Sequence, residues 1–417
     1  MKYDLIVIGG GPAGMIAAGR AGERGARVVL LEKNNHLGLK LLSTGHGRCN
    51  FTNRQADTKE TINAYGGGYK FLFSVFDKFG VEDTIKFFAN LGISAKTEDN
   101  GRVFPLSDKA GDVLRALTLY LEESGVKIKL GAEINAIKAG NDKIKKVLLK
   151  NGERIIGKNF LISTGGRSYP ETGSTGDAYE WLAKLGHKII NPRPALAPIV
   201  VKEKIVKNLE GLSLKDIGIN VYQNNKKIIS RIGNIIFTAD GISGPAILDL
   251  SSRFGLLLTS PTLIKIDFQP EIESVELEKQ LQKNFHRSRN KIFKNYLSGI
   301  VPPKLVPVII KHFRINGQKY VSAVTKEERQ ALASALKEFT FEVQGVKGFN
   351  KAMITAGGVD VNEIDPRTMR SKLFDNLFMA GEILNLDGPT GGYNLQICWS
   401  TGFVAGDSVP YMQLIKK

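Results

Sequence analysis

Lys2-Tyr3-Asp4-Leu5-Ile6-Val7-Ile8-Gly9-Gly10-Gly11-Pro12-Ala13-Gly14 is the segment that decides the fold. A short apolar strand runs directly into a glycine-rich turn, and small residues suited to a helix follow the turn. In this pattern Gly9 permits the tight turn, Gly11 lets the backbone approach a pyrophosphate, and Gly14 lets the helix pack closely on the strand. The helix N-terminus then offers free N–H groups to phosphate. The segment predicts a dinucleotide-binding α/β unit.

A second strand, Arg27 to Leu31, ends at Glu32. Its distance from the glycine turn is close to the spacing of about 20 residues at which an acid bonds the ribose hydroxyls of a dinucleotide. Glycine-rich turns also occur wherever a chain needs positive φ. Strand, helix and acid together favour dinucleotide binding, and the acid favours a ribose without a 2′-phosphate.

The chain continues with alternating strand and helix patterns, which are typical of a parallel sheet. Glu133 to Lys138 and Lys145 to Leu149 predict a hairpin or a meander, and the apolar strand from Lys158 ends in the small residues Thr164-Gly165-Gly166. A strand that ends in small residues lets the backbone approach a ligand at the carboxyl edge of the sheet.

The pattern changes after about residue 191, where prolines precede short alternating segments that predict antiparallel strands. A basic helical stretch follows, and α/β signals return near residue 352. We therefore expect a discontinuous Rossmann-like domain over 1–191 and 352–417. We expect an inserted β domain over 192–270 and 319–351, and a helical subdomain over 271–318.

The block Gly381-Glu382 to Gly391-Gly392-Tyr393-Asn394-Leu395-Gln396 is the second strong signal. A strand delivers a glycine and a carboxylate that can bond ribityl or ribose hydroxyls. A glycine-rich turn then opens a final helix, whose N-terminal amides can stabilise negative charge on a flavin ring. A capped surface loop is the simpler explanation, but two such turns at opposite ends of the chain favour one shared flavin dinucleotide.

Composition sets limits on other functions. The 417 residues carry 58 Lys and Arg against 41 Asp and Glu, a formal net charge of +17. Such an excess attracts anions, so an RNA partner stays open, although the cations are spread along the chain and a solvated lysine-rich surface is the simpler interpretation.

No apolar run reaches the length of about 20 residues that a membrane span needs. Cys49 and Cys398 are the two cysteines, and the five histidines have no metal-ligand spacing. These features predict a cytoplasmic protein without disulfides, membrane contact or a metal site.

Several motifs resemble one known family over nearly the whole chain. They are Lys40-Leu41-Leu42-Ser43-Thr44-Gly45-His46-Gly47-Arg48-Cys49-Asn50-Phe51-Thr52-Asn53, Phe104 to Ala110, Thr164 to Pro170, Thr172 to Asp177, Phe237 to Pro245, Thr355 to Val359 and Gly381 to Gln396. They are similar to bacterial FAD-dependent oxidoreductases that are aminoacetone-oxidase-like or dehydro-bile-acid-reductase-like. His46 and Asn385 depart from the family pattern, which bears on substrate preference if either residue contacts substrate.

The resemblance implies one FAD in a glutathione-reductase-like domain, an inserted β-barrel-like domain, and NAD(P)H as a possible transient donor. The residues that it implies for FAD are Gly9, Gly11, Pro12, Ala13, Gly14, Glu32, Lys33, Lys40, Thr44, Gly45, Arg48, Cys49, Asn50, Ile134, Thr164, Gly165, Gly166, Gly381, Glu382, Gly392, Asn394, Leu395 and Gln396.

The candidates for catalysis each have a plainer alternative. His46 is a candidate acid or base, or a hydrogen-bonded spacer. Arg48 is a candidate partner of an anionic group, or a loop-anchoring ion pair. Tyr393 and Tyr169 are candidate proton donors, or packing residues. Cys49 is a candidate redox thiol, or a small buried hydrophobe.

Taken together, these features predict an FAD-dependent oxidoreductase that passes hydride between flavin N5 and a small organic substrate. NAD(P)H or O₂ would serve the other half-reaction. A reductase of activated C=C bonds and an oxidase of amines or amino acids both stay open. A flavin-dependent RNA-binding or RNA-modifying protein is one alternative, and a flavin-dependent redox sensor or interaction module is another. The substrate and the oligomeric state are not determined by the sequence.

Overall fold

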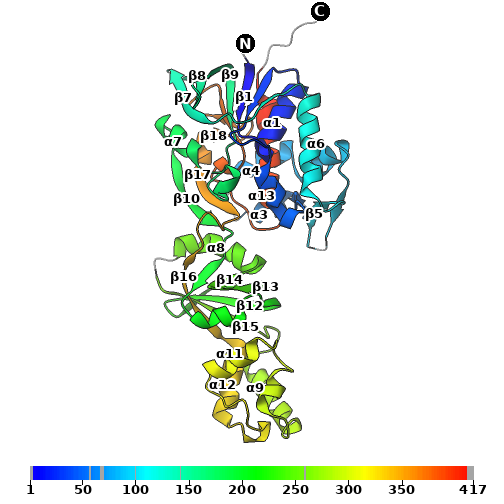
Figure 1. The fold of residues 1–417 in the computed structure, drawn as a ribbon, viewed down its shortest axis with the longest axis vertical. Helices are drawn as coiled ribbons and strands as arrows, with labels where there is room; N and C mark the ends of the chain where they lie inside the picture. The colour runs from blue at the N-terminus through cyan, green and yellow to red at the C-terminus, as the bar shows by residue number, and fades with distance from the viewer. Residues whose placement is uncertain are drawn as a thin grey trace, which may run out of the picture. The chain divides into compact units, whose positions relative to one another are not determined.

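In the computed structural model, the strand that opens the sequence lies inside a parallel sheet (Figure 1). Its neighbours pair in register, with Leu5 opposite Val28 and Ile8 opposite both Leu31 and Ile162. The side chains of this strand are buried, as both faces of a covered parallel sheet require. The order of strands is β18 (Ile364–Asp365), β19 (Arg370–Ser371), β20 (Leu377–Met379), β9 (Arg154–Ile162), β1 (Tyr3–Ile8), β2 (Val28–Leu31) and β6 (Lys127–Lys129).

Two helices that follow glycine-rich turns pack directly on each other. Helix α1 (Pro12–Glu23) follows the first turn and helix α13 (Tyr393–Ser408) follows the last. They approach closely because Gly402 and Gly406 of α13 lie against the backbone of Ala13 and Ala17 in α1. In Figure 1 red ribbon is visible behind the blue helix α1, and the close contacts show that a helix from early in the sequence packs on one from late in it.

Smaller elements complete this part of the chain. The predicted hairpin is present as β7 (Ile134–Gly140) and β8 (Lys143–Leu149), and β8 pairs with β9. The other strands are β3 (Thr52–Asn53), β4 (Ala95–Thr97), β5 (Arg102–Pro105), β10 (Ile189–Ala195) and β17 (Ile354–Val359). The helices are α2 (Leu39–Ser43), η1 (Thr44–Gly47), α3 (Thr58–Asn63), α4 (Lys70–Lys78), α5 (Val81–Asn90), α6 (Ala110–Glu123), η2 (Pro170–Thr172), α7 (Asp177–Lys184), η5 (Val361–Glu363) and η6 (Gly381–Ile383).

A closed antiparallel barrel forms the core of the middle of the chain. Closure removes the exposed strand edges that an open sheet would leave. Its strands, in spatial order, are β11 (Ile199–Val201), β14 (Gly241–Ser243), β13 (Lys226–Thr238), β12 (Ser213–Gln223), β15 (Thr262–Asp267) and β16 (Phe339–Val346). The structure therefore confirms the expected fold class, a Rossmann-like α/β domain with an inserted barrel.

Helices accompany the barrel within the same part of the chain. They are η3 (Lys204–Leu209), α8 (Pro245–Leu257), α9 (Ser274–Arg287), α10 (Phe293–Leu297), α11 (Leu305–His312), η4 (Val321–Ala323) and α12 (Lys326–Lys337). Helix α12 lies in the stretch 319–351 that we expected to be β. Its start follows ordinary capping chemistry, because Thr325 and Glu328 satisfy each other's backbone N–H groups.

The structure describes residues 3–55, 58–65, 70–98, 100–140, 142–257 and 260–410. The chain divides into two compact units, Met1–Pro194 with Phe349–Lys417 (unit 1) and Ala195–Gly348 (unit 2). Each unit has its own hydrophobic core. The three-domain limits expected from the sequence stay a prediction. Within the described ranges, no helix has both the length and the hydrophobicity needed to cross a membrane.

Candidate functional site

The N-termini of α1 and α13 open on the same pocket in unit 1. Pro12 and Ala13 line it from α1, and Asn394 and Leu395 line it from α13. The pocket holds about 1320 Å³ of space free of protein atoms, including some that is open to solvent. Each helix end carries partial positive charge from its free N–H groups. The pocket is therefore suited to a large ligand with more than one anionic or electron-rich part.

Three of the four glycines of the first turn have different surroundings. A side chain at Gly9 would place its Cβ 2.5 Å from the Ser163 carbonyl oxygen, and one at Gly14 would lie 2.0 Å from the Gly9 carbonyl oxygen. A Cβ at Gly11, in contrast, meets no protein atom within 4 Å. Gly9 and Gly14 thus serve chain packing, while Gly11 borders open space where a phosphate can approach the backbone.

Glu32 lies at the end of β2 and is buried. One carboxylate oxygen accepts from the Gly10 N–H at 2.8 Å, and the other accepts from the Asn34 N–H at 2.8 Å. The carboxylate is therefore fixed beside the glycine turn. Each of its oxygens can accept more than one hydrogen bond, so it can also receive ribose hydroxyls.

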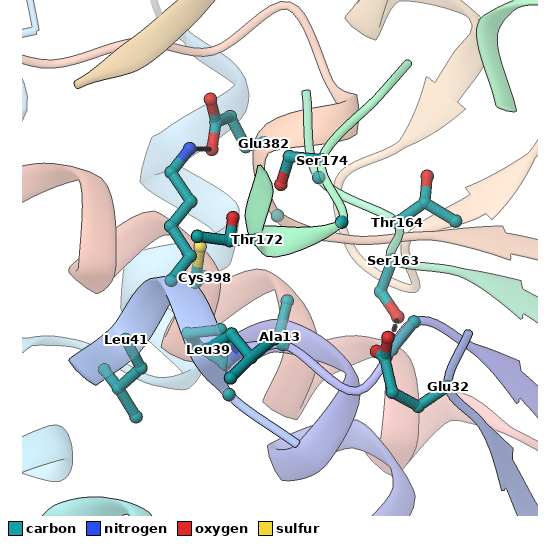
Figure 2. Close-up of a pocket in the computed structure, with 18 of the residues that line it drawn as sticks. Ala13, Glu32, Leu39, Leu41, Ser163, Thr164, Thr172, Ser174, Glu382 and Cys398 are labelled. Carbon is teal, nitrogen blue, oxygen red and sulfur yellow. Dashed lines mark hydrogen bonds and ion pairs between the residues drawn. The ribbon is translucent and has the colours of Figure 1, made fainter. Parts of the chain in front are cut away.

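A polar cluster surrounds Glu382 on the other side of the pocket. Glu382 pairs with the Lys40 ammonium at 2.6 Å, and it accepts from the Ser168 hydroxyl at 2.9 Å and the Thr355 N–H at 2.8 Å. Figure 2 shows Glu382 and Glu32 at opposite sides of the pocket, with Cys398, Ala13 and Thr164 also among the labelled residues. The two acids are therefore placed to bind different parts of one extended ligand.

Unpartnered polar atoms also mark the site. Thr164 lines the pocket, and its buried hydroxyl has no hydrogen-bond partner in the described protein. The buried Asn50 Oδ1 also lacks one among the described residues. Because an unsatisfied buried polar group costs about 1–3 kcal/mol, the Thr164 hydroxyl is suited to a ligand that supplies the missing bond. A polar dinucleotide fits this requirement.

The segment Thr44 to Asn50 has an unusual backbone. His46 and Cys49 have φ values of 58° and 62°, in the left-handed region that non-glycine residues rarely adopt. Hydrogen bonds from the Cys49 N–H to the Thr44 carbonyl and from the Arg48 N–H to the Gly45 carbonyl hold this conformation. Strain of this kind is concentrated at functional sites, and Thr44 lines the pocket.

The side chains of the same segment have other contacts. Arg48 pairs with Glu98 at 2.7 Å and with Asp108 at 2.8 Å, and its guanidinium lies over the Phe104 ring. These contacts match the loop-anchoring alternative for Arg48. His46 is exposed and does not line the pocket. Burial raises the pKa of the Cys49 thiol to about 12, so its reactive thiolate is scarce at neutral pH.

Helix α13 presents alternate faces to the pocket and to the core. Asn394, Ile397 and Cys398 line the pocket at helical spacing, and Leu395 lines it at the first turn of the helix. Gln396 lies on another face, is 1% exposed, and donates to the Thr84 and Ser400 hydroxyls. The sequence assigned Asn394, Leu395 and Gln396 together and passed over Cys398. Residues three and four apart share one face of a helix, so the spacing of Asn394, Ile397 and Cys398 is the signal that distinguishes this pocket-lining face from the face that carries Gln396.

Tyr393 begins α13 and is mostly buried. Its hydroxyl accepts from the Gln55 side chain at 2.8 Å, and its carbonyl accepts from the Tyr65 hydroxyl at 2.8 Å. The ring meets the Tyr65 ring edge to face. Tyr393 does not line the pocket, so these contacts match its packing alternative.

The structure brings most of the expected cofactor residues to one pocket. Those that line it are Gly9, Gly11, Pro12, Ala13, Glu32, Lys33, Lys40, Thr44, Ile134, Thr164, Gly165, Gly381, Glu382, Asn394 and Leu395. Those that do not line it are Gly14, Gly45, Arg48, Cys49, Asn50, Gly166, Gly392 and Gln396. Their ligand contacts stay predictions. The sequence analysis did not assign Ser168 or Thr355 to the cofactor site, although both residues lie in motifs that carry the family resemblance.

Among the described residues, no group of three or more His, Cys, Asp or Glu is arranged to hold a metal ion. Cys49 and Cys398 are both free thiols.

Comparison with known proteins gives matches along almost the entire chain. A family model described as the HI0933-like protein Rossmann domain matches residues 3–408. The 3-dehydro-bile acid delta(4,6)-reductase of Clostridium scindens is 31% identical over 404 residues, which are 96% of this chain and 97% of that protein. The ribosomal RNA dihydrouridine synthase of Escherichia coli is 28% identical over 408 residues, 98% of each chain.

A solved structure supports the fold. The 3-ketosteroid-delta4-(5alpha)-dehydrogenase from Rhodococcus jostii, determined with 4-androstene-3,17-dione, matches with a TM-score of 0.55 and 13% identity. The match covers 98% of this chain and 96% of that one. At this identity the likeness concerns the fold alone.

Proposed function

The chain belongs to the HI0933-like Rossmann-domain family, and from this membership we propose that it binds FAD in the unit 1 pocket and acts as an oxidoreductase. The observation that carries the proposal is the convergence of two helix N-termini and two fixed carboxylates on that pocket. When bound, FAD would supply hydride exchange at N5. The protein supplies binding, orientation and the surrounding field.

Different residues of the pocket would bind different parts of the cofactor. The Gly9 to Gly14 turn and the α1 N-terminus would hold the pyrophosphate, and Glu32 would bind the adenosine ribose. Lys33 lines the adenosine side and pairs with Asp177 at 2.9 Å. Ile134 begins β7 beside this end and would meet adenine through its backbone.

The other end of the pocket would hold the flavin. Glu382 would bond the ribityl hydroxyls, with its position set by Lys40, Ser168 and Thr355. The free N–H groups at the start of α13 would stabilise negative charge on the pyrimidine edge of the ring. The Lys40 to Glu382 ion pair is only partly exposed, so its field in the pocket is weakly screened.

We further propose that the reaction is the reduction of an activated C=C bond. The support is the naming of the relatives: one is a delta(4,6)-reductase and others are dihydrouridine synthases, and each name denotes a product that has gained hydrogen. NAD(P)H would then be the electron donor. Amine or amino-acid oxidation is the competing reaction.

RNA is the second candidate substrate. The net charge of +17 favours a polyanionic partner, and two relatives act on ribosomal RNA by name. In this version the flavin would reduce uridine within an RNA chain instead of a small unsaturated molecule.

The deciding experiment is anaerobic titration of the FAD-loaded protein with NADH and then NADPH, followed by an oxidised acceptor. We expect the visible absorption band of the bound flavin to bleach and to return when an acceptor is added. Return of the flavin band on addition of a 3-oxo-Δ4 steroid would favour the small-molecule reaction. Formation of dihydrouridine in added RNA would favour the RNA reaction. Bleaching by amines alone would contradict the reductase proposal, and failure to bind FAD would contradict the cofactor assignment.

A further inference from the structure

One stretch of unit 2 has an extreme charge composition. Residues 279–326 contain 11 Lys and Arg and no Asp or Glu. At the chain average of 41 acids in 417 residues, about five acids would be expected in a stretch of this length. The stretch runs from the middle of α9 to the start of α12, so the helices beside the barrel carry the excess charge.

The fold gathers part of this charge around one open hollow. We call it the basic groove and define it by Lys279, Lys283, Arg287, Arg289 and Arg329, which line it together with His286 and uncharged residues. Lys279, Lys283 and Arg287 are exposed and lie at successive i, i+4 positions of α9. Leu277, Leu281 and Phe285 bury the other face of this helix.

Among the described residues, four of these five cations lack an acidic partner. Within the part of the chain that the structure describes, Lys279, Lys283, Arg287 and Arg289 form no ion pair or side-chain hydrogen bond with another residue. Arg329 approaches Glu278 at 3.8 Å. Some other cations of unit 2 are paired with acids, as Lys202 is with Glu342 and Lys347 is with Asp240. The groove therefore keeps its positive charge available for a ligand.

An exposed aromatic ring stands next to the groove. Tyr320 is 58% exposed and forms an antiparallel bridge with Ile292. After it in the chain, the Val321 N–H donates to the Lys291 carbonyl and the Ser322 N–H donates to the Arg289 carbonyl. These backbone bonds join the segment that follows Tyr320, whose Val321 and Ser322 line the groove, to the segment that carries Arg289. An aromatic surface next to a row of cations is the combination used to bind single-stranded nucleic acid.

We propose that the basic groove and Tyr320 form a docking surface for the phosphate backbone of RNA. The α9 cations extend over about 12 Å at a rise of about 1.5 Å per residue. One phosphate cannot contact cations so far apart, whereas a repeating polyanion can. A membrane surface would require apolar side chains among the cations, but on α9 the exposed hydrophobic residue is Val275, outside the groove.

This inference rests on the RNA version of the proposed function, and it concerns docking in unit 2 and not chemistry in unit 1. The test compares two triple variants of the full-length, FAD-loaded protein. The groove variant is Lys279→Gln, Lys283→Gln and Arg287→Gln. The matched control removes three exposed cations of the same unit that lie outside the groove, by Lys215→Gln, Lys226→Gln and Lys227→Gln.

The measurement is the affinity for a fluorescently labelled RNA hairpin at several salt concentrations. With about 0.7 to 0.9 counterions released per phosphate contact, the groove variant should lower the salt slope by about 2 to 3. It should also weaken binding at least tenfold near 0.1 M salt, while the control should change binding less than threefold. Equal weakening by both variants, or no binding by the unchanged protein at low salt, would overturn the proposal.

Two further measurements distinguish a surface for the phosphate backbone of RNA from a surface for a membrane. A charge-conserving variant, Lys279→Arg, Lys283→Arg and Arg287→Lys, should bind RNA as the unchanged protein does, and loss of binding in it would contradict a phosphate-backbone surface. Vesicles with anionic phospholipid should bind weakly. Tight vesicle binding that only the groove variant loses, with RNA binding unaltered, would overturn the proposal in favour of a membrane surface.

Dihydrouridine analysis of the RNA separates this inference from the proposed function. RNA binding through the groove without dihydrouridine would leave the docking surface standing and contradict the RNA reaction. Dihydrouridine formed equally well by the groove variant would support the reaction and contradict the docking surface.

Discussion

At the scale of single residues, Gly11 and Gly14 illustrate two different reasons for a glycine in one turn. The backbone at Gly11 is extended, with φ −82°, so alanine fits its conformation, and a Cβ there meets no protein atom. A Cβ at Gly14 would lie 2.0 Å from a carbonyl oxygen. The first glycine borders the open pocket and the second is required by the fold.

We predict that Gly11→Ala keeps the thermal stability of the FAD-free protein and weakens FAD binding at least tenfold, or about 1.4 kcal/mol. The reason is that the added methyl group occupies only the space meant for the pyrophosphate. Isothermal titration with FAD and a melting curve of the FAD-free protein measure the two effects. Gly14→Ala is the control and should lower stability itself. Unchanged FAD affinity in Gly11→Ala would contradict the assigned position of the pyrophosphate.

At the scale of elements, one buried acid links β1 to β9 and to the residue that precedes β2. Asp4 on β1 accepts from the Arg27 backbone N–H at 3.0 Å and side chain at 3.1 Å, and it pairs with Lys158 of β9 at 2.7 Å. Burial by itself would raise the pKa of Asp4, but the bonds from Arg27 and Lys158 outweigh it and lower the pKa from 3.8 to about 2.

A lowered pKa in the folded state means that this acid contributes stability above its unfolded pKa, and that the contribution is lost as pH falls from about 4 to about 2. We predict that Asp4→Asn reduces the free energy of unfolding by about 2 kcal/mol at pH 7. The difference between variant and unchanged protein should shrink below pH 4. Urea unfolding across this pH range checks it, and a difference that stays constant with pH would argue against ionisation of Asp4 as the cause.

The crossing of α1 and α13 depends on glycine. A Cβ at Gly402 would lie 2.4 Å from the Ala13 carbonyl oxygen, in the pocket-lining turn of α1. We predict that Gly402→Ala costs about 1–3 kcal/mol of stability, as overpacking does. It should also weaken FAD binding, because it displaces one helix N-terminus from the other. Denaturant unfolding and FAD titration measure the two losses.

Gly111 provides the matched control. It lies within α6 and a Cβ there meets no atom within 4 Å. Gly111→Ala should therefore stabilise the protein by about 0.5–1 kcal/mol, the ordinary helix preference for alanine, without an effect on FAD binding. Equal stability effects in the two variants would mean that the helix crossing is not as tight as the structure indicates.

At the scale of the whole molecule, the unit 1 pocket draws its lining from distant parts of the sequence but from one unit only. We predict that FAD at 100 times its dissociation constant stabilises unit 1 by about 2.7 kcal/mol. Amide exchange in β1, β9 and α13 should slow, while exchange in the barrel strands β12 and β13 should not. Comparable slowing in the barrel would show that the two units unfold together.

The sequence alone determined the Rossmann turn, the acid after β2, the discontinuous domain and the family. Each depends on local spacing, and strand, turn and helix signals are properties of short segments. The glycine turn is predictable because its backbone conformation requires glycine wherever the unit occurs, and the position of Glu32 follows from the spacing of the unit. The bond from Glu32 to a ribose stays a prediction.

Only the tertiary structure decided which face of α13 meets the pocket, and that Arg48 is paired with Glu98 and Asp108. It alone joined Lys40, Ser168, Thr355 and Glu382 into one cluster. It also gathered scattered cations into the basic groove. The physical reason is common to all of these features. They depend on contacts between residues far apart in sequence, and such contacts are set by packing of the whole chain and not by the preferences of any one segment.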